Sequence, residues 1–191
     1  ASAESVHQGD VRNLDLRELS SIQGFAFGFP CNDFSTVGER LGVSGKYGPL
    51  YSYGVDVLNH LNPNWFFAEN VGGIRSSNDG VAFRRILADL SSAGLSGYRV
   101  VPHLYKFEEY GVPQARHRVI VIGIRNDLDF EFRPPSPSPF RNIDVSSRTC
   151  LESPPISPSA LNNELTKQSP TVIRRLEHIA PGHNAFNSDL P

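Results

Sequence analysis

The sequence GFPCNDFS, residues 28–35, follows a largely apolar run, residues 22–27, that is typical of a buried β-strand. Its glycine, proline and serine indicate that the strand gives way to a loop at this point. Cys31 therefore lies just past a strand end, next to a proline, in a place suited to a nucleophilic thiol. A structural role in the core is the commoner fate of a single cysteine, so the rest of the chain must decide between the two interpretations.

Helix-like and strand-like segments alternate after this loop. Apolar residues recur at helical spacing in residues 50–61, and again in the helix expected between the start signal at residues 78–80 and Gly94. Short apolar runs typical of buried strands occupy residues 65–68, 98–105 and 119–124. This alternation predicts an α/β domain with a mostly parallel sheet.

Two later stretches supply groups that complement a thiol. Glu69 follows one predicted strand, and Arg116 and Arg118 precede another. Because ligands bind α/β sheets at the carboxyl ends of the strands, we expect Cys31 and Glu69 to lie close together, although 38 positions separate them. A thiolate can attack an electron-poor ring carbon while a carboxylic acid bonds a ring nitrogen and guanidinium groups hold an exocyclic oxygen. Taken singly, the carboxylate and the arginines are more often solvated surface groups.

The composition limits the class of protein. A chain of 191 residues is long enough for one domain with a sizeable core. Its formal net charge of −2 gives no electrostatic argument for a large phosphate footprint. The two cysteines, Cys31 and Cys150, do not form a disulfide framework, and no apolar run approaches the roughly 18 residues of a membrane span. These features favour a cytoplasmic or otherwise intracellular protein.

The composition changes after Arg133, because eight of the fifteen prolines lie between Pro134 and Pro170. We therefore expect two parts. Residues 1–133 form a catalytic domain, and residues 134–191 form a proline-rich, irregular stretch that acts as a linker and ends with a short helix at residues 171–179. Cys150 lies in this second part and should be dispensable.

Five motifs follow one another in the chain: GDV at residues 9–11, GFPCNDFS at residues 28–35, GPLY at residues 48–51, ENV at residues 69–71 and YGVPQARHR at residues 110–118. Their order and intervals resemble those of the cytosine-5 DNA methyltransferases over roughly residues 7–128. Residues 169–191 are also similar to the stretch that precedes the target-recognition region in that family. The resemblance therefore implies that residues 134–191 comprise the proline-rich linker and the start of the target-recognition region.

The resemblance implies a Rossmann-like methyltransferase domain that uses S-adenosylmethionine. Such an enzyme transfers a methyl group to carbon 5 of a flipped-out cytosine in double-stranded DNA, through a covalent Cys–cytosine intermediate. The activity belongs to DNA modification or to a restriction-modification system. The resemblance implies neither a metal ion nor a membrane.

Site residues are carried over by position. The resemblance implies that Cys31 attacks carbon 6 of cytosine, that Glu69 engages ring nitrogen 3, and that Arg116 and Arg118 position the base and Glu69. The residues expected to contact the cofactor are Asp10, Val11, Pro30 and Leu50. The residues expected to act on the DNA side are Asn32, Ser35, Asn70 and Gln114, with Asn70 holding the Pro30–Cys31 backbone. Asn32 stands where the family usually has glutamine, which implies a shorter contact.

Parts of the family pattern are absent from these residues. The glycine-rich cofactor loop, its acidic ribose partner, the target-recognition region and the last conserved helix do not occur in the sequence. The domain is therefore expected to be incomplete, and residues 1–191 alone are expected to be inactive. Two alternatives stay open: an RNA cytosine-5 methyltransferase, and a non-catalytic fragment or one subunit of a split enzyme that a complementing subunit completes.

Overall fold

The structure is a computed structural model that describes residues 6, 8–30, 50–152, 154–157, 159–162, 166–180 and 183–184. Cys31, Asn32 and Ser35 lie outside the described residues. The chain divides into two units, Ala1–Val145 and Ser146–Pro191.

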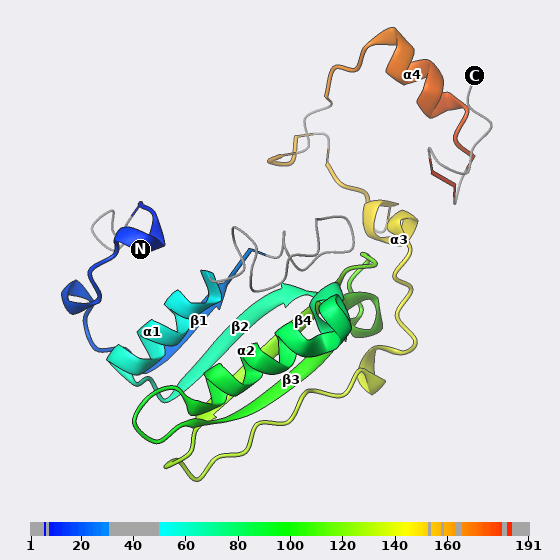
Figure 1. The fold of residues 1–191 in the computed structure, drawn as a ribbon. Coiled ribbons are helices and arrows are strands. Elements are labelled where there is room, and N and C mark those ends of the chain that lie inside the picture. The colour runs from blue at the N-terminus through cyan, green and yellow to red at the C-terminus, as the bar shows by residue number, and fades with distance from the viewer. Residues whose placement is uncertain are drawn as a thin grey trace. The chain divides into compact units, whose positions relative to one another are not determined.

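The first unit is built on a four-stranded sheet in the order β1-β2-β4-β3 (Figure 1). Its strands are β1 (Gly24–Gly28), β2 (Trp65–Val71), β3 (Tyr98–Lys106) and β4 (His117–Arg125). β1 pairs in parallel with β2, whereas β4 pairs antiparallel with both β2 and β3. The strands β1, β2 and β3 therefore run in one direction, and β4 runs between β2 and β3 in the other.

The predicted α/β class is confirmed, but the sheet is mixed where the sequence predicts a mostly parallel one. Two of its three pairings are antiparallel. The reason is the short connection between β3 and β4, residues 107–116. A parallel pair needs a crossover of a dozen or more residues, usually a helix, whereas a shorter connection returns the chain antiparallel.

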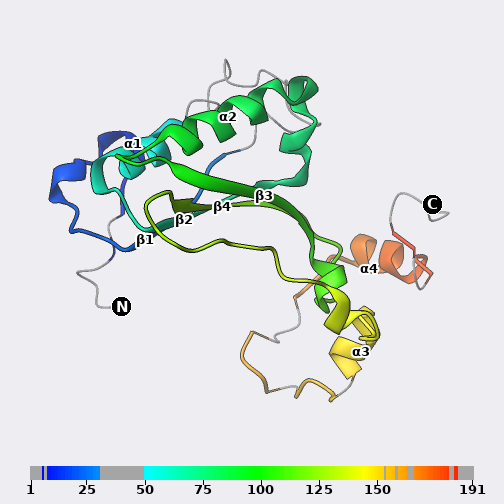
Figure 2. The same cartoon turned by 90° about the horizontal axis from the view of Figure 1, so that it is seen from below.

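Two helices, α1 (Tyr51–Leu61) and α2 (Val81–Ser92), cover one face of the sheet (Figure 2). Alternate strand residues point toward them, among them Phe66 and Ala68 of β2, which are fully buried. α1 ends where Asn62 adopts a left-handed conformation with φ 48°. α2 begins after Gly80, which has φ 72°. The core formed by the sheet and helices includes Leu58, Ile86, Leu90, Tyr98, Val119 and Val121.

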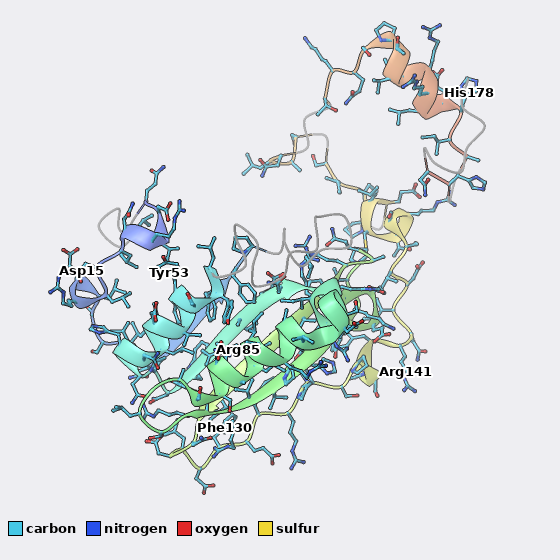
Figure 3. The ribbon with its side chains drawn as sticks, in the orientation of Figure 1. Asp15, Tyr53, Arg85, Phe130, Arg141 and His178 are labelled. Carbon is cyan, nitrogen blue, oxygen red and sulfur yellow. The ribbon has the colours of Figure 1, made fainter. Side chains whose placement is uncertain are left out.

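The chain beyond β4 crosses the opposite face of the sheet (Figure 2). The Arg99 guanidinium donates hydrogen bonds to the carbonyls of Asn126, Leu128 and Phe130, at 3.1, 2.5 and 2.8 Å. Phe130, labelled in Figure 3, lines an apolar cavity of about 400 Å³ with Trp65. Farther along, the Tyr110 hydroxyl donates to the Pro135 carbonyl at 3.0 Å. Residues 126–135 are therefore held by polar contacts to Arg99 of β3 at one end and to Tyr110 of η8 at the other.

The second unit contains α3 (Ser147–Glu152) and α4 (Pro170–Glu177). Ser169 caps α4 by accepting a hydrogen bond from the Val172 amide at 3.4 Å, and Pro170 occupies the first helical position. The other helical elements among the described residues are short 3₁₀ helices: η2 (Val11–Asn13), η3 (Leu16–Glu18), η6 (Gly72–Arg75), η7 (Ser77–Gly80), η8 (Phe107–Tyr110) and η9 (Ser138–Phe140). Among the residues the structure describes, no helix is long and apolar enough to cross a membrane.

Candidate active site

The strand register brings two of the four expected catalytic side chains, Glu69 and Arg118, to one end of the sheet. Gly28, the last residue of β1, pairs with Glu69 of β2, and Arg118 near the start of β4 pairs with Val71. The sequence predicts that the second strand ends before Glu69, whereas β2 continues to Val71. Glu69 and Asn70 are therefore consecutive strand residues, and their side chains point to opposite faces of the sheet.

Glu69 and Arg118 form an ion pair. Arg118 Nε lies 2.6 Å from Glu69 Oε1, and the side chains are 19% and 36% exposed for Arg118 and Glu69, respectively. Arg118 Nη1 also donates to the His117 carbonyl at 2.9 Å, which fixes the plane of the guanidinium. Glu69 Oε2 lies 3.5 Å from where a Cβ on Gly28 would be. The carboxylate thus lies beside Gly28, the last residue of β1, and Cys31 follows Gly28 by three positions in the sequence.

Asn70 joins the ends of β1 and β2. It is 4% exposed, and it is the one buried polar side chain among the residues the structure describes. Its Nδ2 donates to the Phe29 carbonyl at 3.2 Å, and its Oδ1 accepts from the Val71 amide at 2.8 Å. Both polar atoms of the side chain are therefore used, as burial requires, and one of them holds the backbone directly before Pro30.

Gln114 and Arg116 lie in the loop before β4, and both are exposed. The Arg116 carbonyl accepts from the Phe107 amide at 3.1 Å, but its guanidinium forms no ion pair with another described residue. Arg118, and not Arg116, is thus the arginine that contacts Glu69.

Three of the four residues expected to contact the cofactor share a cavity. Val11, Pro30 and Leu50 line a space of about 300 Å³ on the helix-covered side of β1. Phe27 of β1 and Phe29, which directly follows the strand, add aromatic surface, so a flat heterocycle would fit between apolar walls.

Tyr53 is a lining residue that the sequence interpretation missed (Figure 3). Its position three residues after Leu50 on α1 was the available signal, because residues at that spacing share a helix face. Gly54 follows it and allows α1 to approach β1, since a Cβ there would lie 2.3 Å from the Phe27 ring.

Asp10, the fourth expected cofactor residue, is adjacent to Val11 and engaged by Arg12. Its Oδ1 accepts from the Arg12 amide and Nε at 3.0 and 2.9 Å, and its Oδ2 accepts from Arg12 Nη2 at 2.5 Å. These hydrogen bonds lower the pKa of Asp10 to about 2. The carboxylate is 40% exposed, so it keeps access to solvent and stays ionised at neutral pH.

The family model for C-5 cytosine-specific DNA methylases matches residues 1–188 of the chain. The chain belongs to this family. The resemblance drawn from the five motifs is therefore confirmed. This methylase chain is 53% identical over 192 residues to the Type II methyltransferase M.BbvI of Brevibacillus brevis. The alignment covers 98% of the chain and 50% of the relative. It is 36% identical over 192 residues to M.NgoFVII of Neisseria gonorrhoeae, covering 96% and 50%.

The methylase chain thus spans about half the length of these curated relatives. Its fold is similar to that of a prophage-encoded protein of Escherichia coli described as a DNA modification methyltransferase. That match has a TM-score of 0.57 and 24% identity, and it covers 85% of the chain and 44% of the other. The Entamoeba histolytica methyltransferase EhMeth matches with a TM-score of 0.50 and 17% identity over 67% of the chain and 40% of that structure. Both likenesses concern the fold.

Proposed function

We propose that the enzyme containing this chain methylates carbon 5 of cytosine in double-stranded DNA, with S-adenosylmethionine as methyl donor, within a restriction-modification system. The observation that supports the chemistry best is the Glu69–Arg118 ion pair, at the sheet edge where β1 leads toward Cys31. The observation that supports the biological setting is family membership together with similarity to Type II methyltransferases.

Each residue of the site has a chemical task in this reaction. The Cys31 thiolate forms a bond to carbon 6 of cytosine, and electron density moves to carbon 5. Glu69 delivers a proton to ring nitrogen 3 through Oε2, the oxygen that faces β1, while Arg118 holds Oε1. When bound, S-adenosylmethionine supplies the methyl group that carbon 5 accepts. Loss of the carbon 5 proton to a base then breaks the bond to sulfur and regenerates the Cys31 thiolate.

The remaining residues bind and orient the two substrates. Val11, Pro30 and Leu50 hold the adenine of the cofactor between apolar surfaces, with Tyr53 beside them. The Asp10 carboxylate accepts a hydrogen bond from the exocyclic amine of that ring. Asn70 keeps the backbone before Pro30 in place through its bond to Phe29. We assign Arg116 to the base, and Asn32, Ser35 and Gln114 to the DNA around it.

Covalent trapping tests the proposal in an active preparation of the enzyme that contains this chain. Duplex DNA with 5-fluorocytosine at the target position should capture the protein, because fluorine on carbon 5 prevents the elimination that frees the thiolate. Cys31→Ser should abolish both capture and methyl transfer, whereas the matched control Cys150→Ser should retain them. Capture that persists in Cys31→Ser would disprove the assignment of the nucleophile. A parallel reaction with transfer RNA separates a DNA enzyme from an RNA enzyme.

A further inference from the structure

The loop that bears Arg116 is closed by contacts between its two ends. It begins with η8 and turns at Gly111, which has φ 79°. The Phe107 amide donates to the Arg116 carbonyl at 3.1 Å, and the Val112 amide donates to the Phe107 carbonyl at 3.2 Å. Backbone hydrogen bonds therefore hold the start of the loop to the residue directly before β4.

A side-chain pair crosses the same junction. Glu108 Oε1 in η8 lies 2.7 Å from Nε2 of His117, the first residue of β4. A hydrogen bond from the Glu108 backbone amide and the contact with His117 lower the pKa of the Glu108 carboxyl, and Lys106 adds a smaller effect. Glu108 is thus the anionic partner, and the Nε2–H of His117 donates. The neighbouring Glu109 pairs with Lys106 Nζ at 3.1 Å and takes no part in this junction.

Glu108 is held mainly through one of its two carboxylate oxygens. Oε1 contacts His117, whereas Oε2 is buried without a hydrogen-bond partner among the described residues. A buried oxygen that lacks a partner is unfavourable, and the lowered pKa shows that the contacts of the carboxylate outweigh this cost. The contact with His117 is therefore the side-chain interaction that favours a glutamate at this position.

His117 connects this pair to the Glu69 carboxylate. Its imidazole contacts Glu108, and its carbonyl accepts from Arg118 Nη1 at 2.9 Å. Arg118 Nε in turn contacts Glu69 Oε1 at 2.6 Å. If His117 shifted, its carbonyl would move and the guanidinium would lose one of its two described anchors.

We infer that Glu108 and His117 form a positioning pair that holds Arg118 in register with Glu69. The inference rests on the proposed function only for its effect on methyl transfer. The geometric part, that the pair restrains Arg118, can be tested without catalysis.

The kinetic test uses Glu108→Ala, His117→Ala and the double variant in an active preparation of the enzyme, with active sites counted by covalent trapping. Misplacement of a group by about 1 Å can cost up to ~10²-fold in rate, so we expect each single variant to lose about 10-fold in the methyl-transfer step. The double variant should lose no more than either single one, because both remove the same contact. The KM for the cofactor should not change. The matched control is Glu109→Ala, which removes the adjacent ion pair and should leave the rate unaltered.

The exchanged variant Glu108→His/His117→Glu should recover most of the rate, since it restores the contact with its partners reversed. The inference would be overturned if the rate loss of the double variant equalled the product of the two single losses. It would also be overturned if a folded exchanged variant recovered no activity. A lower melting temperature with a normal rate per active site would show a structural role instead.

Hydrogen exchange at the Arg118 Nε–H, followed by NMR, provides the readout that needs no activity. The exchange should accelerate in Glu108→Ala and stay at the wild-type rate in Glu109→Ala. If the wild-type enzyme fails to methylate DNA but the exchange accelerates, the proposed function fails while the positioning stands. If the exchange is unchanged in Glu108→Ala, the positioning inference is wrong whatever the enzyme does.

Discussion

At the scale of single residues, Arg118 holds the Glu69 carboxylate through one of its two oxygens. Arg118 holds Oε1 at 2.6 Å, and Oε2 faces the end of β1. Glu69→Gln keeps the shape of the side chain but can neither pair with Arg118 as an anion nor transfer a proton. We expect a loss of about 10²-fold or more in the rate of methyl transfer, the scale of general acid–base catalysis.

The melting temperature of Glu69→Gln should change little, because the side chain is 36% exposed. The measurement is single-turnover methyl transfer beside a thermal melt, with Glu131→Gln as the matched control. Glu131 is an exposed carboxylate that pairs with Arg133. A large fall in melting temperature with normal turnover per folded molecule would show that Glu69 is a structural residue.

Asp10 gives a prediction about pH. Its pKa is lowered to about 2 from the usual 3.8, mainly by hydrogen bonds from Arg12. A depressed pKa in the folded state adds stability that is present above the unfolded pKa and is lost as the pH falls through about 2. Arg12→Ala should move the pKa of Asp10 back toward 3.8, as measured by NMR titration of its carboxyl carbon. An unchanged pKa in that variant would mean that another group holds the carboxylate.

The site residues that the sequence predicts lie in recognisable motifs, whereas the missed ones depend on contacts between segments that are distant in the chain. Glu69 and Arg118 lie in motifs whose residue types alone indicate the chemistry. Tyr53 and Glu108 act through neighbours that only the folded chain supplies, namely the wall of the cofactor cavity and His117. Helical spacing from Leu50 is the one local indication of Tyr53. No local pattern marks Glu108, because its signal is a distance between two segments.

At the scale of elements, the close approach of α1 to β1 depends on Gly54. A Cβ at this position would lie 2.3 Å from a carbon of the Phe27 ring. Gly54→Ala should therefore force the helix away from the strand and lower the free energy of unfolding by about 1–3 kcal/mol, the usual cost of overpacking. It should also weaken cofactor binding, since Gly54 lines the same cavity as Leu50.

The matched control for Gly54→Ala is Gly73→Ala in η6. A Cβ on Gly73 would have no neighbour within 4 Å. Chemical denaturation of both variants measures the difference between them. Equal stability of the two variants would show that α1 repacks on β1 at no cost.

The sequence predicts where the four strands lie, but it does not predict their exact ends or which strands pair. Short apolar runs indicate all four strands, but β2 extends to Val71 and β4 begins at His117, beyond the predicted runs. Apart from Val71 the added residues are polar, and they are in strands because Val71 pairs with Arg118 and Lys106 pairs with His117. Pairing of this kind depends on distant segments, which is also why the antiparallel position of β4 was not predicted.

At the scale of the whole molecule, the described lining of the cofactor cavity suits only one part of the cofactor, the adenine ring. The lining is apolar and aromatic, with the Tyr53 hydroxyl as the one side-chain hydrogen-bonding group among the described lining residues. Such walls suit an adenine ring. They offer no charged partner for the amino and carboxylate groups of the methionine part, and burying those charges unpaired is costly.

The 191-residue chain by itself is therefore predicted to bind S-adenosylmethionine weakly and to methylate no DNA. Calorimetric titration of S-adenosylmethionine into the purified chain measures the affinity, and transfer of tritium from labelled cofactor to unmethylated DNA measures turnover. Activity should appear when the remaining segments of a relative such as M.BbvI are supplied, in the same chain or as a second polypeptide. Micromolar affinity together with turnover by the chain alone would contradict the prediction, and would mean that its own residues, or a second copy of it, complete the methionine end of the site.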